Sequence, residues 1–107
     1  MRWRVWSAWC SVLPGPEILR RQLQFWGQVQ GVGFRYRARW AAQGLGLTGW
    51  VQNLPDGSVL MQVQGPESAI DRMILQIEAG HYVRIENLRA WPLPLEPHEY
   101  GFSIRED

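Results

Sequence analysis

The sequence predicts a single α+β domain in which an antiparallel sheet is covered on one face by two helices. Segments in which apolar and polar residues alternate, as in half-buried strands, are interspersed with two segments in which apolar residues recur at helical spacing. The elements follow one another in the order β-α-β-β-α-β, with the fourth strand leading into a short fifth. With 107 residues, the chain has room for one such domain and one hydrophobic core.

The first part of the pattern is a strand, a glycine-rich loop and a helix. Residues 22–29 alternate, with Leu23 and Phe25 on one side, and predict a half-buried strand. A run with three glycines follows at 27–33. Residues 34–43 then carry apolar side chains at helical spacing, and the glycines beyond them end the predicted helix.

The second part is a hairpin, another helix and two more strands. The hairpin is indicated by the turn signal Pro55-Asp56-Gly57 between two alternating segments. Pro66 suits the first turn of a helix, and Gly80 stops it. The predicted elements are strands over 47–54 and 58–64, a helix over 66–77, and strands over 83–91 and 100–104.

This order is that of the split βαβ, ferredoxin-like fold, with both helices on one face of the sheet. In this plan the first and third strands are neighbours at the centre of the sheet. The loop after the first strand lies at one end of the sheet. Because the fold serves many functions, the function has to be argued from particular residues.

The first twenty residues differ from the rest, so we divide the chain into an N-terminal extension, 1–20, and a domain, 21–107. Trp3, Trp6 and Trp9 lie three positions apart after a basic start. A signal peptide and an interfacial helix each fit part of this pattern. We favour a disordered extension or a start codon assigned too early, because the following Pro-Gly-Pro run continues no regular element.

The composition argues against several classes of protein. The net charge of +1 is too small for bulk nucleic acid as a partner, and no run of ~18 apolar residues could span a membrane. Cys10 is the single cysteine, so no internal disulfide can form, and we expect a reducing, cytoplasmic location. His81 and His98 lie far apart without an acidic cluster, so we expect no metal and no cofactor. We also expect a monomer.

The stretch 27–35 carries the chemistry. Its glycines permit a positive φ and let main-chain N–H groups face a ligand, and the start of a helix adds positive partial charge. Arg35 supplies a planar fork of donors, so the stretch favours capture of a small oxyanion, phosphate above all. A tight turn with an exposed arginine explains the loop equally well when it is taken alone. The chain has no lysine for a Walker A loop, and Tyr36 stands where a dinucleotide fingerprint needs its third glycine.

Two blocks of the sequence resemble the acylphosphatase family. The first, Val29-Gln30-Gly31-Val32-Gly33-Phe34-Arg35, is similar to the signature loop of that family. The second consists of Gly49-Trp50-Val51-Gln52-Asn53, Asp56-Gly57-Ser58-Val59 and Gln64-Gly65. The resemblance covers residues 23–104. Trp26 and Gln28 depart from it, since small or basic residues are common beside the loop.

The resemblance implies hydrolysis of acyl phosphates, which are carboxylic-phosphoric anhydrides, to a carboxylate and inorganic phosphate. It implies that Arg35 binds the phosphoryl oxygens and that Asn53 orients a water molecule for in-line attack. Asn53 has no usable pKa as a base, but its amide can donate and accept hydrogen bonds. The main-chain N–H groups expected to assist Arg35 belong to Gln28, Val29, Gln30, Gly31, Val32, Gly33 and Phe34.

Other interpretations remain open. Taken alone, Asn53 is more typical of a strand end before a turn. A phosphate- or carbamoyl-phosphate-binding module without turnover is a second function, since similar domains begin larger carbamoyl-transfer proteins; the absence of further domains before Asp107 favours a free-standing enzyme. RNA binding needs aromatic residues on the central strands, and residues 58–64 contain none. We therefore expect a small-molecule acyl phosphate as partner, and neither nucleic acid nor a membrane.

Overall fold

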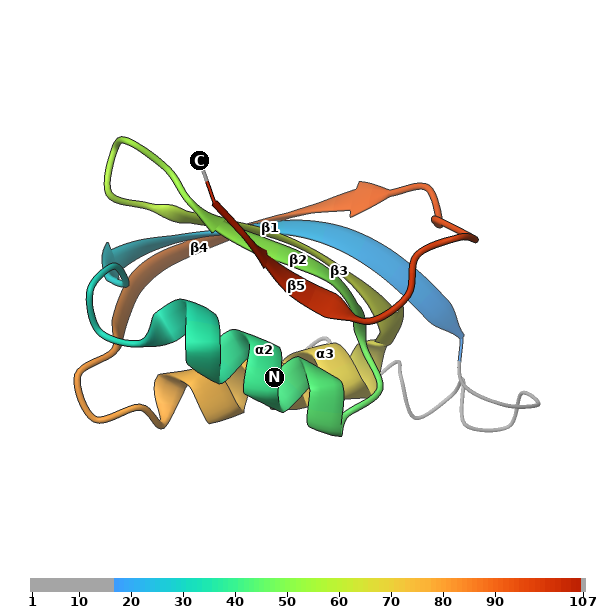
Figure 1. Cartoon of the computed structure of the whole chain (residues 1–107), viewed down its shortest axis with the longest axis horizontal. Helices are drawn as coiled ribbons and strands as arrows, with labels where there is room; N and C mark the ends of the chain where they lie inside the picture. Colours follow the sequence, from blue (N-terminus) through green and yellow to red (C-terminus); the bar gives the residue numbers. More distant parts are fainter. Residues whose placement is uncertain (1–16, 107) are drawn as a thin grey trace.

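The structure is a computed structural model that describes residues 17–106 (Figure 1). Five strands form one sheet in the order β4-β1-β3-β2-β5, and two helices lie side by side against one face of it. The elements are β1 (Ile18–Gln28), α2 (Phe34–Gly44), β2 (Thr48–Asn53), β3 (Val59–Pro66), α3 (Glu67–Glu78), β4 (Arg84–Leu93) and β5 (Phe102–Arg105). The ferredoxin-like arrangement predicted from the sequence is confirmed.

The hydrophobic core lies between the sheet and the two helices. The side chains predicted to face inward from β1 and β3 are buried, and α2 contributes small alanines that let it lie close to the sheet. The apolar stripe of α3 is buried at three positions and half-buried at a fourth, Ile74. The core residues of these elements are Leu23, Phe25, Phe34, Ala38, Ala41, Val59, Met61, Val63, Ile70, Met73 and Ile77.

The first strand begins four residues before the predicted start, so residues 18–20, which belong to the predicted extension, form part of β1. Arg20 helps to hold this added part of the strand. Its guanidinium is nearly buried because it pairs with the Glu99 carboxylate at 2.6 Å and donates to the Gln62 side chain at 2.9 Å. The alternation by which the strand is predicted ends before this part, because the polar Arg21 stands on the side of the strand that faces the core. Residues 1–16 lie outside the described part of the chain, so the division into extension and domain stays a prediction.

The sheet is mixed, which corrects the expectation of an antiparallel sheet. β5 runs parallel to β2, with Gly49 opposite Phe102 and Gln52 opposite Arg105. The chain leaves β4 at the end of the sheet where β2 begins and crosses to the other edge. It therefore enters β5 at the same end as β2, and the two strands must run in the same direction.

The strand register determines which segments meet at the opposite end of the sheet. Phe25 of β1 pairs with Val59 of β3, which pairs with Asn53 of β2. The end of β1, the start of β3 and the end of β2 therefore lie side by side, and the loop from β1 into α2 leaves from this end (Figure 1). Within residues 17–106, no helix is long and apolar enough to cross a membrane.

Candidate active site

The glycine-rich loop between β1 and α2 is held at both ends and open in the middle. Val29 and Phe34 are buried, and the Phe34 ring meets Phe25 edge-on with their centroids 4.9 Å apart. Gly31 and Gly33 are exposed and have φ values of 74° and 81°. A Cβ at either glycine would meet no atom within 4 Å, so the left-handed backbone, rather than lack of space, favours glycine here.

The N–H groups of this loop are available to a ligand. Among the hydrogen bonds of residues 17–106, none engages the N–H groups of Gly31, Val32 or Gly33, and the Gly33 carbonyl accepts the bond from Arg37 at 3.0 Å that starts α2. The first turn of α2 contains no acidic side chain. The free amides and the positive end of the helix dipole together favour an anion at this end of the sheet.

The Gln30 side chain fastens the loop to the turn between β2 and β3. Its Nε2 donates to the carbonyl oxygens of Leu54 at 2.7 Å and Ser58 at 2.8 Å. These are the first residues on either side of the hairpin turn, so the bonds hold the loop against the segment that follows Asn53. The sequence predicted Gln30 as a main-chain contributor, and no pattern in the sequence signalled this role of its side chain.

The turn itself is reinforced from within. The Asp56 carboxylate accepts hydrogen bonds from the hydroxyl and the N–H of Ser58, and the hydroxyl bond is the main reason that the pKa of Asp56 lies below its ordinary value. Gln24 of β1 donates to the Ser58 hydroxyl oxygen at 3.0 Å, which ties the turn to the neighbouring strand.

Asn53 ends β2 on the face that carries the helices. Val51, two residues earlier on the same side of the strand, is fully buried beneath them. The Asn53 Oδ1 atom is buried, and it has no hydrogen-bond partner among the described residues. An amide oxygen in this condition costs free energy unless something donates to it.

Arg35 is the second residue of α2, directly after the glycine-rich loop, and its side chain is about one quarter exposed. Its Nη1 atom lies 3.8 Å from Oε1 of Glu106. Because Gln52 pairs with Arg105, Glu106 follows β5 at the level of Asn53. The structure thus brings Arg35, Asn53 and the loop to the same end of the sheet.

The other predicted loop residues fall into two groups. Gln28 is exposed at the last position of β1, where it pairs with Arg84, whereas Val32 is half-buried against the core. Gln28 therefore stands at the edge of the loop. Over residues 17–106, the structure contains no group of three or more His, Cys, Asp or Glu side chains that could hold a metal ion.

Comparison with known proteins decides the family. A model of the acylphosphatase family matches residues 21–104. The chain belongs to the acylphosphatase family. It is 38% identical over 87 residues to an acylphosphatase from Clostridium perfringens, an alignment that covers 80% of this chain and 98% of that protein.

Solved structures agree with this assignment. The crystal structure of the acylphosphatase from Bacillus subtilis superposes with a TM-score of 0.74 at 31% identity, covering 81% of this chain and 98% of that one. Full-length HypF, solved in a phosphate- and nucleotide-bound form, gives a TM-score of 0.74 at 30% identity, covering 89% of this chain but 13% of HypF. The chain is thus an enzyme of the acylphosphatase type, and family and fold together support hydrolysis of acyl phosphates.

Proposed function

We propose that Arg35 and the loop amides bind the phosphoryl group of an acyl phosphate and that Asn53 positions the water that attacks it. The observation that carries this proposal is the buried, unpartnered Oδ1 of Asn53 at the same end of the sheet as Arg35. A water molecule donating to that oxygen would satisfy it. The Asn53 amide group can also donate a hydrogen bond, so the side chain suits a water-holding role better than a basic one.

The binding half of the proposal rests on charge. Arg35 offers N–H donors in a planar fork that matches two oxygens of a phosphate, and the unengaged N–H groups of the loop add neutral donors. Hydrogen bonds to charged groups are worth about 1.5–3 kcal/mol each. The same donors would stabilise the oxygens in a loose transition state, where positioning and charge stabilisation provide most of the catalysis.

The proposed reaction is an in-line displacement at phosphorus. The oxygen of the water forms a bond to phosphorus while the bond from phosphorus to the carboxylate oxygen breaks, and the carboxylate leaves with the electron pair. A carboxylate leaves without being protonated, since its conjugate acid has a pKa of about 4 and is ionised at neutral pH. The proton lost by the water passes to the released phosphate or to solvent, so no side chain need act as a general base.

The test is hydrolysis of benzoyl phosphate by the full chain and by Arg35→Gln and Asn53→Ala. Each change should lower kcat/KM more than a hundredfold, which corresponds to about 3 kcal/mol of transition-state stabilisation. Arg39→Gln and Asn87→Ala serve as matched controls, because both residues are exposed: Arg39 lies one turn beyond Arg35 on α2, and Asn87 lies on β4, which β1 and β3 separate from β2. Wild-type rates in either active-site variant would refute the role of that residue.

A second candidate function is phosphate binding without turnover. It is favoured by the similarity to HypF, in which the matched region is a small part of a larger protein. A wild-type chain that fails to hydrolyse benzoyl phosphate but binds inorganic phosphate through Arg35 would establish this alternative. We further propose, from the sequence, a cytoplasmic monomer that needs no metal ion; loss of hydrolysis in EDTA would contradict the last point.

A further inference from the structure

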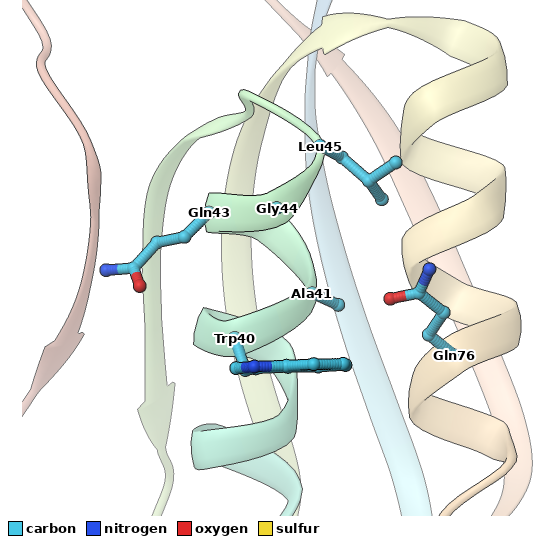
Figure 2. A pocket seen from close by; sticks show the side chains of 6 residues that line it. All are labelled: Trp40, Ala41, Gln43, Gly44, Leu45 and Gln76. Atoms are coloured by element: carbon cyan, nitrogen blue, oxygen red, sulfur yellow. The ribbon is translucent and has the colours of Figure 1, made fainter.

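A shallow groove lies on the outer side of the helical layer, away from the active site. It has a volume of about 450 Å³ and is lined by residues of the second half of α2, the turn after it and α3. Figure 2 shows the Trp40 ring and the Leu45 side chain extending from the α2 side toward α3, with the Gln76 amide reaching back toward them. The lining residues are Trp40, Ala41, Gln43, Gly44, Leu45 and Gln76.

The groove presents apolar surface that the described residues leave uncovered. The Trp40 side chain is 72% exposed, and Tyr36, one turn earlier on the same side of α2, is 61% exposed. Large aromatic side chains are usually more buried than this in a soluble domain, and their burial is a strong stabilising contribution. This face of α2 is therefore a favourable surface for another segment to pack against.

Small residues and one polar tie keep the groove open. Gly44 has a helical backbone, and a Cβ there would meet no atom within 4 Å. Arg37 donates to the Gln76 carbonyl at 2.8 Å and so fixes the separation of the two helices. The groove therefore has open space beside Gly44 and a hydrogen bond that joins the two helices beside it.

The chain itself supplies a segment that fits. Sixteen residues precede Glu17, and they include Trp3, Trp6 and Trp9 but no acidic residue. They join the domain at β1, where Ile18 pairs with Pro66, the residue before α3. Because α2 ends at this same end of the sheet, the segment enters beside the groove rather than beside the active site.

Length also permits the contact. Sixteen extended residues span up to about 53–58 Å, whereas the whole of α2, with eleven residues, is about 16 Å long. An indole ring has a large apolar face and one N–H donor. The groove offers the complement, with apolar walls from Trp40 and Leu45 and the amide of Gln76 facing the opening.

We propose, in place of the disordered extension favoured from the sequence alone, that the tryptophan-rich segment, residues 1–16, docks on its own domain in the α2–α3 groove. The contact covers Trp40 and places an indole of the segment against the Gln76 amide. The proposal concerns the same molecule, and a second copy or a lipid surface would be a different occupant. It is independent of the catalytic roles of Arg35 and Asn53.

The native Cys10 provides the test, because it is the single cysteine of the chain and lies within this segment. A nitroxide on Cys10 of the full chain should erase the NMR signals of the Trp40 indole N–H and the Gln76 amide. It should spare the Trp91 indole, since Trp91 pairs with Gln22 on the sheet face opposite the helices. Gly44→Phe, which fills the groove, should restore the erased signals, and Gly44→Ala should leave them erased.

Four results would overturn the proposal. One is equal signal loss at Trp40 and Trp91, and another is no loss at either. The third is signal loss at Trp40 in a mixture of two kinds of chain, one with the nitroxide but no isotope and the other with the isotope but no nitroxide. This result would assign the groove to a second copy. Signal loss at Trp40 that persists in Gly44→Phe would equally exclude the groove as the site of contact.

Discussion

Replacing Gln30 with alanine should distinguish the role of this side chain in positioning the loop from its contribution to the stability of the domain. The change removes two hydrogen bonds, to Leu54 at 2.7 Å and to Ser58 at 2.8 Å. Each neutral hydrogen bond contributes about 0.5–1.5 kcal/mol, so Gln30→Ala should lower the free energy of unfolding by about 1–3 kcal/mol. In urea, with a slope of about 1–2 kcal/mol per molar for a domain of this size, the midpoint should fall by roughly 1 M.

The change should also raise the catalytic barrier, by an amount of the same order as the loss of stability. Without the Gln30 side chain, the loop that presents the amides is no longer fastened to the segment after Asn53. A misplacement of about 1 Å can cost up to ~100-fold in rate, so kcat for benzoyl phosphate should fall roughly 10- to 100-fold. The product carboxylate or phosphate can be followed directly, and KM is expected to change less than kcat.

Gln64→Ala is the matched control for this prediction. The Gln64 side chain also makes two hydrogen bonds to backbone, both to Glu96, at 2.8 and 3.2 Å, but at the opposite end of the sheet. It should lower stability by an amount of the same order and leave kcat unchanged. Equal loss of kcat in the two variants, or an unchanged kcat in a destabilised Gln30→Ala, would refute the positioning role of Gln30.

Two further changes test the charges near the site. Glu106→Gln removes the carboxylate that lies 3.8 Å from Arg35. Exposed ion pairs are worth about 0–1 kcal/mol, so without this carboxylate Arg35 should bind inorganic phosphate up to about fivefold more tightly, as measured by product inhibition. Weaker binding would show that Glu106 does not compete with phosphate for Arg35. Asp56→Asn removes a carboxyl whose pKa is depressed in the folded protein by its bonds to Ser58. A carboxyl group whose pKa is lower in the folded than in the unfolded protein stabilises the fold at pH values above its unfolded-state pKa of about 4. This stabilisation is lost as the pH falls through the folded-state pKa. Asp56→Asn should therefore be less stable than the wild type at neutral pH and should lose less stability on acidification. An acid-unfolding profile that matches the wild type would show that the Asp56 bonds do not favour the folded state.

The strands and helices could be predicted because they depend on local periodicity. Alternation placed Val59, Met61 and Val63 on the core face of β3, and helical spacing placed Ile70, Met73 and Ile77 on the buried face of α3. The φ values of Gly31 and Gly33 likewise agree with what glycine permits. Each of these predictions needed only neighbouring residues.

The remaining features depend on contacts between distant segments. The burial of Arg20 requires Glu99, 79 positions away, and the fastening of the loop requires that Gln30 reach two backbone carbonyls of another hairpin. The direction of β5 follows from the path of the connection across the sheet end. The unpartnered oxygen of Asn53 could not be foreseen either, because it depends on what packs above β2. None of these features produces a periodic pattern in the sequence.

The parallel pairing of β5 with β2 affects the order in which the enzyme is assembled. Gly49 meets Phe102, so the edge of β2 beside Asn53 is completed by a strand that is synthesised much later. Contacts between such distant positions form slowly, since a long loop must close before they stabilise anything. On the ribosome, the loop, Arg35 and Asn53 emerge well before their end of the sheet can be finished. The proposed phosphate capture and water positioning should therefore arise together, at the last stage of folding, when β5 joins the sheet.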